Sequence, residues 1–571
     1  MEANDSTAIF SSSDSMKTLL AFFYEWERTR PDAPFLRQPQ GNSWSVITWR
    51  EAGQEARKIA AGLQQLGLKP GDHVGLISKN CYHWVIADLA IMMGRFVSVP
   101  FYPNLTARQL AEVIQLGTIQ ALFVGKLDDW EAIQSGIDPA LPIIRFPHYP
   151  GNSVITRGIA WEKWLAEQIP LSGQPNPDIH DIWTILFTSG TTGTPKGVML
   201  DYYAPAALME MEYKHHRLRI FQGDTHRFFS YLPLNHIAER IIVEAASLWT
   251  GGTISFAESL DTFAKNLQST QPTVFLAVPR IWTKFQMGIL ERIPEQKLAL
   301  ILRIPGLAGL LKKKLAKTLG LSQARILLTG AAPASDSLKN FFRKLGLPIL
   351  EVYAMTENCG GCTLMPMEEM KSGTVGIPLP GVEIRILPDT GEVVMRAPWN
   401  MRGYYNAPEK TAEVLQDGWI YTGDQGALSP DGHLQLTGRV SDAFKSAKGK
   451  FIVPAPIEGS FAENTLIEQI CVAGLAIPQP LALVVLSETG QKTHPELLAD
   501  EIRNTLRRVN DTLPKYEWVK SVVILREPWT IENGMLTPTL KVKRNVLYQR
   551  FQEKLHEWYD QDQEIIWEGE H

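Results

Sequence analysis

Apolar side chains recur at helical spacing in two segments near the N-terminus. Met16–Arg28 and Trp49–Leu66 each repeat apolar residues at every third or fourth position, which predicts two amphipathic helices. Thr48 and Glu51 have the spacing of a capping box, so the second helix is expected to begin at Trp49. Gly67 follows its last apolar residue and is a typical helix stop.

Short apolar runs alternate with helical segments in the next part of the chain. His73–Ile77 and Val97–Phe101 have the length and composition of buried strands, and the apolar segment Tyr82–Met93 between them is expected to be a buried helix. Further strands are expected at Ile119–Val124 and Val274–Ala277. Strand–helix–strand units of this kind predict a layered α/β domain with parallel strands.

The composition changes near Gly438, beyond which charged segments alternate with short strands and helices, as in a small α+β lid. The longest uncharged run, residues 469–487, reaches the length of a membrane span, but Pro478-Gln479-Pro480 divides it. We therefore expect two buried strands, Ile470–Ile477 and Leu481–Leu486. The expected organisation is a large α/β domain over residues 1–438, a connection over 439–442 and a small lid domain over 443–571.

Composition and charge narrow the class of protein. The chain is 44% hydrophobic and 20% charged, which is typical of soluble proteins, and its net charge of -5 gives no global attraction to nucleic acid. Four cysteines show no disulfide framework, which favours a reducing compartment. Residues 1–15 lack the basic and apolar regions of a signal peptide, so a cytoplasmic location is expected.

Two further segments allow more than one interpretation. Cys359 and Cys362 form a C-x-x-C, but neither a thioredoxin-like context nor a second Cys/His pair accompanies them, so we expect no redox or zinc role. The basic amphipathic segment Leu310–Leu319 fits an anionic membrane surface. A Lys-rich face is usually just solvated, so we favour a surface helix with four leucines toward the core: Leu310, Leu311, Leu315 and Leu319.

The segment Leu186–Leu200 has the character of a phosphate-binding loop. Apolar residues precede and follow a loop rich in glycine and hydroxyl side chains. Its backbone N–H groups, its hydroxyls and the ammonium of Lys196 can together form a cradle for a phosphate. It is not a Walker A loop, because Pro195 follows five residues after Gly190 and no Gly-Lys-Ser/Thr comes next. The candidate phosphate-binding residues are Thr188, Ser189, Gly190, Thr191, Thr192, Gly193 and Lys196.

Polar residues in other short strings suit a nucleotide. In Val352–Glu357, an aromatic ring (Tyr353) can stack on a base, Thr356 can bind a phosphate oxygen and Glu357 can hold Mg²⁺. Asp424 follows a predicted strand, and its carboxylate can accept both hydroxyls of a ribose. Taken alone, a tyrosine is as well explained by core packing, and an aspartate by a turn.

Three more strings carry candidate chemistry. Gly330 and Ala331 follow a predicted strand, where a flat base or an acyl chain can approach the backbone. Arg439 can bind ribose and phosphate oxygens in a fork, although a solvated basic linker is the simpler interpretation. His236 follows a proline turn, and a lone histidine is more often structural than catalytic.

Together these strings resemble the acyl-adenylate-forming enzymes: acyl-CoA synthetases, luciferases and peptide-synthetase adenylation domains. The resemblance spans Thr48–Arg544 and is most specific in the Ser-Gly-Thr-Thr-Gly-x-Pro-Lys-Gly loop. The form Leu-Pro-Leu-x-His-x-x-Glu-Arg at residues 232–240 is similar to that of the long-chain fatty acid branch. The family usually has Gly where this chain has Ala354, which leaves the size of the substrate open.

The resemblance implies roles for the candidate residues. The loop, Gly330, Ala331, Tyr353 and Thr356 would bind the nucleotide and acyl groups, with Asp424 and Arg439 on the ribose and phosphate. Thr188 and Glu357 would hold Mg²⁺, and His236 would line the carboxylate side of the substrate site. Lys541, with Lys543 as the alternative because Leu540 replaces the usual glycine, would reach the α-phosphate. Lys445, Lys448 and Gly449 would meet the phosphopantetheine or the CoA phosphates.

The resemblance further implies a long-chain fatty acid–CoA ligase that uses ATP, Mg²⁺ and CoA. The small domain would turn about a hinge at residues 439–442, where Ser441 replaces the family's usual Lys or Asp. An acyl carrier protein as acceptor, a shorter or aryl acid as substrate, and a non-catalytic binder of nucleotide or acyl groups stay open. So does peripheral contact with the inner face of a membrane. Nothing in the sequence points to nucleic acid.

Overall fold

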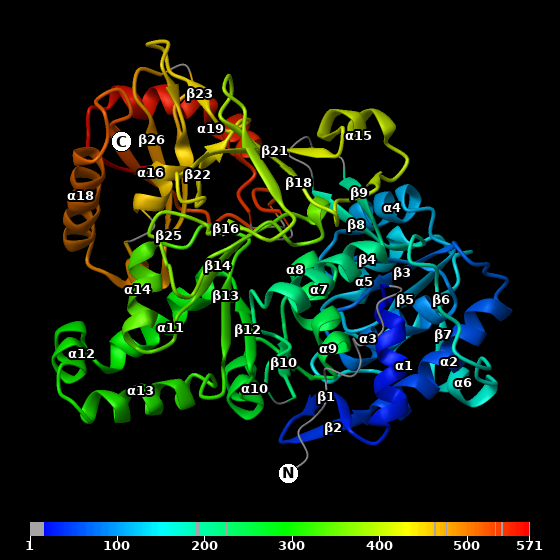
Figure 1. Ribbon diagram of the computed structural model, residues 1–571. Helices are drawn as coiled ribbons and strands as arrows, with labels where there is room; N and C mark the ends of the chain where they lie inside the picture. Colours follow the sequence, from blue (N-terminus) through cyan, green and yellow to red (C-terminus); the bar gives the residue numbers. More distant parts are fainter. Residues whose placement is uncertain are drawn as a thin grey trace.

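The computed structural model describes residues 16–189, 195–223, 225–461, 464–475, 477–530, 533–537 and 541–569. Figure 1 shows a large N-terminal part, coloured blue through green, and a small C-terminal domain in orange and red that lies beside α11 and α14. The predicted fold class, a large layered α/β domain with a small C-terminal α/β domain, is confirmed.

An eight-stranded sheet forms the first half of the large domain, in the order β19-β9-β8-β4-β3-β5-β6-β7. Its central strands pair in parallel and are buried on both faces, which explains their continuous apolar sequences. The strands are β3 (His73–Ile77), β4 (Val97–Phe101), β5 (Ala121–Val124), β6 (Ile143–Arg145), β7 (Ile159–Ala160), β8 (Ile182–Ser189), β9 (Pro195–Asp201) and β19 (Gly403–Tyr404).

A nine-stranded sheet forms the second half, in the order β16-β15-β14-β13-β12-β10-β11-β1-β2. Strands β11, β10, β12, β13 and β14 pair in parallel. The strands are β1 (Pro34–Gln40), β2 (Ser43–Thr48), β10 (Arg227–Ser230), β11 (Thr253–Phe256), β12 (Val274–Ala277), β13 (Ile326–Thr329), β14 (Leu350–Tyr353), β15 (Thr363–Leu364) and β16 (Ile377–Pro378).

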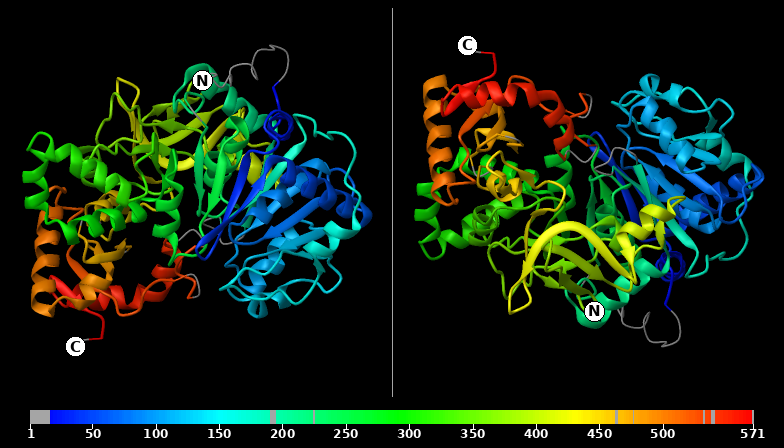
Figure 2. Two further views of the ribbon diagram at one scale, coloured as in Figure 1. Left: turned by 90° about the horizontal axis from the view of Figure 1, so that it is seen from below. Right: turned by 90° about the horizontal axis from the view of Figure 1, so that it is seen from above.

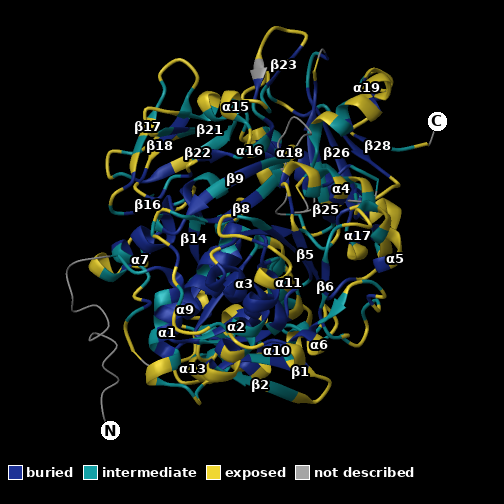
Figure 3. Ribbon diagram, turned by 90° about the vertical axis from the view of Figure 1, so that its right-hand side faces the viewer, coloured by how far each residue is buried: buried dark blue, intermediate teal, exposed yellow. Residues whose placement is uncertain are grey.

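Helices cover the sheets, and the main core lies where they meet. Helix α3 (Tyr82–Met93) is apolar except for His83 and Asp88 and is buried along almost its whole length, as the dark blue interior of Figure 3 shows. The capping box predicted for α2 (Trp49–Gln65) is present: Thr48 and Glu51 each accept a hydrogen bond from the other's backbone N–H. Helix α1 (Leu19–Thr29) begins three residues later than predicted, because Thr18 caps it.

Several other helices connect the strands of the large domain. They are α4 (Ala107–Leu116), α5 (Trp130–Ile133), α6 (Trp161–Glu167), α7 (Tyr203–His215), α8 (Ile237–Glu239), the π-helical η3 (Arg240–Ala245), α9 (Ala246–Thr250), α10 (Phe263–Thr270), α11 (Pro279–Arg292), α12 (Glu295–Leu302), α13 (Leu307–Thr318), α14 (Asp336–Lys344) and α15 (Pro408–Val414).

A five-stranded antiparallel sheet comes before the small domain in the chain, and a four-stranded sheet forms the core of the small domain. Figure 2 shows the small domain, in orange and red, at one side of the molecule. The five-stranded sheet contains β17 (Glu383–Ile386), β18 (Glu392–Arg396), β20 (Leu415–Gln416), β21 (Trp419–Leu428) and β22 (Leu434–Arg439). The small domain contains the hairpin β23 (Phe444–Lys445) and β24 (Phe451–Ile452), the sheet of β25 (Ile467–Ala473), β26 (Leu481–Leu486), β27 (Ser521–Ile524) and β28 (Ile565–Trp567), and the helices α16 (Pro454–Phe461), α17 (Glu488–Lys492), α18 (Pro495–Asp511) and α19 (Arg544–Asp560).

The uncharged run near residue 478 is two antiparallel strands, as predicted, although β25 begins and ends earlier than expected. In the described part of the chain, no helix has the length and apolar composition required to cross a membrane. Cys359 and Cys362 are both buried, and burial raises the pKa of each thiol well above its usual range.

The expectation for the leucines of residues 310–319 is wrong in one respect. Leu311, Leu315 and Leu319 pack against the core, but Leu310 is 68% exposed and points away from it. Helix α13 has no buried residue at all. Periodicity shows which side chains share a face, but it does not show how much of that face a neighbouring element covers.

Candidate functional site

Three neighbouring parallel strands end at one edge of the large sheet, and candidate residues follow two of them. β12, β13 and β14 pair in parallel. Gly330 and Ala331 follow β13, while Tyr353 ends β14 and is followed by Thr356 and Glu357. The carboxyl ends of parallel strands meet at the same edge, which is where α/β proteins bind ligands. The fold therefore brings these five residues to one edge.

Tyr353, Asp424 and Arg439 form a hydrogen-bonded chain. The Tyr353 hydroxyl donates to Asp424 Oδ2 at 2.7 Å, and Arg439 Nε donates to Asp424 Oδ1 at 2.8 Å. The antiparallel pairing of β21 with β22 sets Asp424 directly opposite Arg439. Burial would lower the pKa of Arg439, but the Asp424 and Asp442 carboxylates outweigh burial and raise it. A fixed carboxylate with unused lone pairs suits two neighbouring hydroxyls of a ligand.

Glu357 lies beside a second tyrosine, Tyr404. The Tyr404 hydroxyl donates to Glu357 Oε1 at 2.7 Å, and Lys196 Nζ lies 5.2 Å from the centre of the Tyr404 ring. β19 pairs with β9, which places Tyr404 next to the strand that carries Lys196. Burial and the Glu357 carboxylate raise the pKa of Tyr404 well above its usual range. One carboxylate is enough for Mg²⁺ that keeps waters and phosphate ligands, so Glu357 fits that ion.

Lys541 reaches this group of charges from the small domain. Lys541 as a whole is exposed, yet protein surrounds its ammonium closely enough that desolvation lowers its pKa. The positive charge of Arg439 lowers the pKa further, while Asp424 and Glu357 oppose that change. Its backbone is held by a hydrogen bond from Lys541 N to Thr537 Oγ1 at 3.0 Å. Charged side chains outside the small domain thus act on the ammonium of a lysine that the small domain carries.

His236 lies within the electrostatic range of Lys541. Burial, and then the Lys541 charge, lower the pKa of His236 to about 4, so the ring is neutral at pH 7. Its Nδ1 accepts a hydrogen bond from the backbone N–H of Ala238 at 3.2 Å. A neutral ring that accepts at Nδ1 carries its proton on Nε2. His236 therefore offers a hydrogen-bond donor at Nε2.

The turn after β13 is tight and strained. A Cβ at Gly330 would lie 2.8 Å from Val352 Cγ2. Strand β14, which carries Val352, therefore comes too close for any residue but glycine at this position. Ala331 has a φ of 65°, a left-handed conformation that non-glycine residues rarely adopt. Strain of this kind collects at functional sites, where the surrounding structure maintains it.

The sequence matches the family described as "AMP-binding enzyme" over residues 23–405, and the "AMP-binding enzyme C-terminal domain" over residues 442–563. The chain belongs to the AMP-binding enzyme family. It is therefore one of the adenylate-forming enzymes, a group that includes AMP-forming ligases of acids with CoA. The gap between the two matched regions contains Asp424 and Arg439.

Curated relatives of this AMP-binding enzyme cover nearly its whole length. A long-chain-fatty-acid–CoA ligase of Mycobacterium tuberculosis is 29% identical, over 95% of this chain and 97% of the relative. A peroxisomal long chain acyl-CoA synthetase of Arabidopsis thaliana is 30% identical, over 90% of this chain and 82% of the relative.

Solved structures share the fold. The adenylation domain of a carboxylate reductase from Mycobacterium chelonae superposes with a TM-score of 0.79 at 21% identity, covering 98% of this chain and 93% of that one. The o-succinylbenzoate CoA synthetase of Bacillus subtilis, in complex with its acyl-adenylate intermediate, has a TM-score of 0.71 at 21% identity, covering 92% of this chain and 97% of that one.

Part of the candidate phosphate-binding loop of this AMP-binding enzyme lies outside the described residues. Gly190, Thr191, Thr192 and Gly193 fall there, as does the side chain of Ser189. The two strands that flank the loop, β8 and β9, pair antiparallel up to Ser189 and Pro195. The hydroxyl of Thr188 lies 3.5 Å from the Lys196 carbonyl oxygen, so it is only weakly held and is free to bind a ligand.

Lys445, Lys448 and Gly449 are not brought to this group. They lie on and next to the β23–β24 hairpin, and Figure 1 draws β23 at the outer end of the small domain. Lys445 and Lys448 are exposed, and Gly449 adopts a φ of 75° in the turn. In this arrangement of the domains, the small domain presents Lys541 and not the hairpin.

Sequence reasoning missed Tyr404. Its hydroxyl contacts Glu357, which lies 47 residues earlier, and β19 is only two residues long. A lone tyrosine before another tyrosine carries no local signal of such a contact. Only the long-range pairing of β19 with β9 reveals it.

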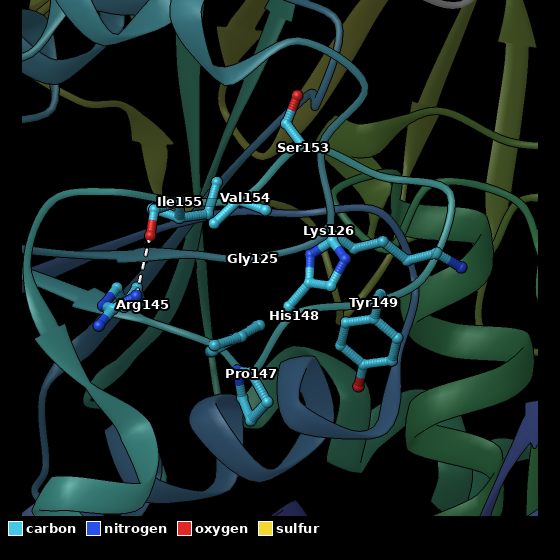
Figure 4. Close-up of a pocket in the computed structure, with 10 residues that line it drawn as sticks. Gly125, Lys126, Arg145, Pro147, His148, Tyr149, Ser153, Val154 and Ile155 are labelled. Atoms are coloured by element: carbon cyan, nitrogen blue, oxygen red, sulfur yellow. Dashed lines mark hydrogen bonds between the residues drawn. The ribbon is translucent and has the colours of Figure 1, made fainter.

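A separate hollow lies at the carboxyl ends of β5 and β6, away from the candidate residues (Figure 4). Lys126, Arg145, His148, Tyr149 and Ser153 are among the residues that line it, and its volume is about 30 Å³. That volume has room for one or two water molecules, so it does not suit a nucleotide or an acyl chain.

Proposed function

We propose that this AMP-binding enzyme is a long-chain fatty acid–CoA ligase that forms an acyl-AMP from ATP and then an acyl-CoA. The observation that carries the proposal is the meeting of Lys541 with Asp424, Glu357, Arg439 and His236, because it joins a lysine of the small domain to candidate nucleotide and carboxylate residues. The names of the relatives that match nearly the whole chain support a long-chain fatty acid as the substrate and CoA as the acceptor.

The chemistry needs charge stabilisation at the α-phosphate. The carboxylate oxygen of the acid attacks the α-phosphorus, the bond to the β-phosphate oxygen breaks, and pyrophosphate leaves with the electron pair. Negative charge grows on the α-phosphate oxygens, where Lys541 and the donors of the loop would stabilise it. His236, which donates from Nε2, would orient the attacking carboxylate. Mg²⁺, when bound with ATP, supplies further charge neutralisation, and Glu357 and Thr188 would hold it.

Tyr353, Asp424 and Arg439 would hold the nucleoside. The tyrosine ring offers a stacking face for adenine, and its hydroxyl fixes the Asp424 carboxylate that would accept the ribose hydroxyls. Holding the reactants in line contributes a large share of the rate enhancement. The acyl side is expected around Tyr231, His236, Leu328 and Ala354. Aromatic rings already pack there, since the Tyr231 ring lies 5.9 Å from Phe275 and 4.9 Å from Phe263.

The second half-reaction would need the small domain to turn. Arg439 is bound to Asp424 of the large domain, whereas Asp442 accepts a hydrogen bond from Arg544 of the small domain at 3.0 Å. Only Val440 and Ser441 separate these two attachments, so we place the pivot there and the domain boundaries at residues 438 and 443. Rotation would withdraw Lys541 and bring the Lys445–Gly449 hairpin toward the site, where it would meet CoA.

A substrate panel tests the acid and the acceptor. Pyrophosphate release is measured with acetate, octanoate, dodecanoate, octadecanoate and benzoate, with and without CoA. The proposal expects strong release with the long acids that becomes multi-turnover only when CoA is present. A burst that CoA does not change would indicate a carrier protein as acceptor, and release only with acetate or benzoate would overturn the long-chain assignment. ATP binding without turnover would indicate a non-catalytic binder.

Lys541→Ala tests the division of labour, with Lys543→Ala as the matched variant on the same segment. Loss of one stabilising donor typically raises the barrier by about 3 kcal/mol, so Lys541→Ala should slow acyl-AMP formation by about 100-fold. Thioester formation from supplied acyl-AMP should continue at the normal rate. The reverse pattern, in which only Lys543→Ala slows acyl-AMP formation, would assign the role to Lys543. If Lys541→Ala slowed both half-reactions equally, Lys541 would not be specific to acyl-AMP formation, and this part of the proposal would be wrong.

A further inference from the structure

A helical arm, residues 291–319, projects from the large domain between β12 and β13. It contains the end of α11, all of α12 and α13, and the turn between them. Figure 1 draws α12 and α13 at the periphery of the molecule, and Figure 2 shows the same helices at an outer edge. One side of the arm is attached to the body, because Leu298 is buried and Leu302, Leu311 and Leu315 pack against the core.

The outer side of the arm exposes a cluster of aliphatic side chains. Leu300 is 62% exposed and Leu310 is 68% exposed, while Ile304 and Leu307 are each 44% exposed. Leu300 lies near the end of α12, Ile304 lies in the turn, and Leu307 and Leu310 lie in the first turns of α13, so all four are close to the turn that joins the helices; we call them the apolar tip. Single exposed leucines are ordinary on a protein surface, but several around one turn indicate a surface that binds something.

Cations flank the apolar tip on both helices. On α12, Lys297 precedes Leu300 by three residues, and on α13, Lys314 and Lys317 follow Leu307 and Leu310 at spacings that share one face. Residues 291–319 contain seven Lys or Arg and two Asp or Glu, a net charge of +5, whereas the whole chain has a net charge of -5.

These cations are available to a ligand. Lys297, Lys313, Lys314 and Lys317 are exposed, and within the part of the chain that the structure describes they form no ion pair. The arm carries no Trp or Tyr, the residues that dominate the centres of protein–protein interfaces. Aliphatic residues next to lysines match an anionic lipid surface instead, since the lysine stems lie along the acyl region while their ammonium groups reach the phosphates.

We propose that the arm is a docking surface for an anionic phospholipid bilayer. Leu300, Ile304, Leu307 and Leu310 enter the interface between headgroups and acyl chains, and the lysines of α12 and α13 bind the lipid phosphates. This inference goes beyond the ligase activity and does not depend on it, because it rests on the exposure and charge of the arm alone. Docking there would hold the enzyme at a surface where apolar acids collect.

The first experiment measures cosedimentation of the full-length protein with vesicles, without ATP or a fatty acid. One set of vesicles is phosphatidylcholine, and the other is phosphatidylcholine and phosphatidylglycerol in equal parts. The proposal expects binding to the anionic vesicles that weakens as salt is added, and little binding to the neutral ones. Absent binding, or equal binding to both vesicles at all salt concentrations, would overturn it.

Variants then locate the surface. Each lysine near an anionic membrane contributes a factor of about five in affinity, so the triple variant K313A/K314A/K317A should bind the anionic vesicles about 100-fold more weakly. L307S/L310S should weaken binding at every salt concentration. The matched controls are K69A/R108A/K515A, which removes three exposed cations elsewhere, and Leu497→Ser, which removes an exposed leucine of α18. Controls that reduce binding as much as the arm variants would contradict the assignment to the arm.

Two further measurements distinguish lipid docking from misfolding of the variants and from self-association. Thermal melting and pyrophosphate release without vesicles should be the same for the arm variants and the unmodified protein, which shows that the variants fold. Light scattering reports the oligomeric state. If the arm variants change only the oligomeric state and leave vesicle binding intact, the apolar tip is an interface between copies of the chain, and the proposal is wrong.

Discussion

At the scale of single residues, Glu239 holds the segment that carries His236. Glu239 Oε1 accepts hydrogen bonds from the backbone N–H of Tyr231 at 3.0 Å and from Asn80 Nδ2 at 3.4 Å. Asn80 Nδ2 also donates to the Leu232 carbonyl oxygen at 2.6 Å. The carboxyl group is buried, and burial raises its pKa to about 8. Glu239 is therefore mostly protonated at pH 7, and acts as a neutral support for the segment before His236.

The raised pKa of Glu239 predicts how stability depends on pH. The folded state keeps the carboxyl protonated up to about pH 8, whereas the unfolded chain ionises it near its ordinary pKa of 4.5. This contribution is complete below the unfolded pKa and is lost as the pH rises to about 8. The isosteric variant Glu239→Gln cannot ionise, so its free energy of unfolding should gain on that of the unmodified protein by about 1.4 kcal/mol per pH unit over this range. Thermal melting at several pH values measures the difference, and a difference that does not change with pH would contradict the prediction.

At the scale of elements, a buried charge network ties α3 to the π-helical η3. Arg240 donates to both oxygens of Asp88, at 3.2 and 3.0 Å, and its Nε lies 3.5 Å from Glu244 Oε2. The guanidinium lies over the Trp183 ring, 4.4 Å from its centre. All three polar side chains are buried, and burial raises the pKa of Glu244 well above its usual range, so Asp88 is the main charged partner of Arg240. Breaking one partner of such a network costs more than removing both, because it leaves an unpaired charge in the interior.

A double-mutant cycle tests the network. Asp88→Ala leaves the Arg240 guanidinium without its main partner and should lower the free energy of unfolding by about 3–5 kcal/mol. Arg240→Met removes the cation and keeps most of the side-chain volume. The double variant D88A/R240M should therefore be more stable than D88A alone, as measured by denaturant unfolding of the large domain. A double variant that loses the sum of both single effects would show that the pair is not coupled.

Local signals explain which elements could be predicted from the sequence. The capping box at Thr48 and the prolines at 478 and 480 act within a few residues, so the start of α2 and the division of β25 from β26 were both readable. Strand β19 could not be predicted, because its two residues form a strand only by pairing with β9, some two hundred residues earlier in the chain. Leu310 was misplaced for a similar reason: whether a helix face is covered depends on the body beside it.

In the candidate site, too, local motifs could be predicted from the sequence and long-range contacts could not. The motifs named Tyr353, Glu357, Asp424 and Arg439, and the structure shows how three of them are joined: Asp424 accepts hydrogen bonds from both Tyr353 and Arg439. It also shows why Gly330 must be glycine, since the side chain of Val352 fills the space that a Cβ would need. That contact and the one between Tyr404 and Glu357 join distant segments, so neither leaves a local pattern in the sequence.

At the scale of the whole molecule, the arrangement of the two domains corresponds to one half of the proposed reaction. Lys541 lies among the charges of the large domain, and the Lys445–Gly449 hairpin lies at the outside of the small domain. An ion pair between Arg280 of α11 and Glu468 of β25 joins the domains in this arrangement. An exposed pair of this kind contributes little stability, so it permits the rotation that the second half-reaction requires.

Fixing the domains in this arrangement should therefore separate the two half-reactions. Arg280→Cys and Glu468→Cys together place two thiols at the contact, and a bismaleimide with a cleavable disulfide spacer would join them. The four native cysteines are buried, so the reagent should leave the unmodified protein active, which is the control. The joined variant should still form acyl-AMP in a single burst of pyrophosphate release, but multiple turnover with CoA should fall more than about tenfold, because the lysine of the first step would still occupy the site. Reduction of the spacer should restore turnover, and a joined enzyme that turns over with CoA at the normal rate would show that no domain rotation is needed.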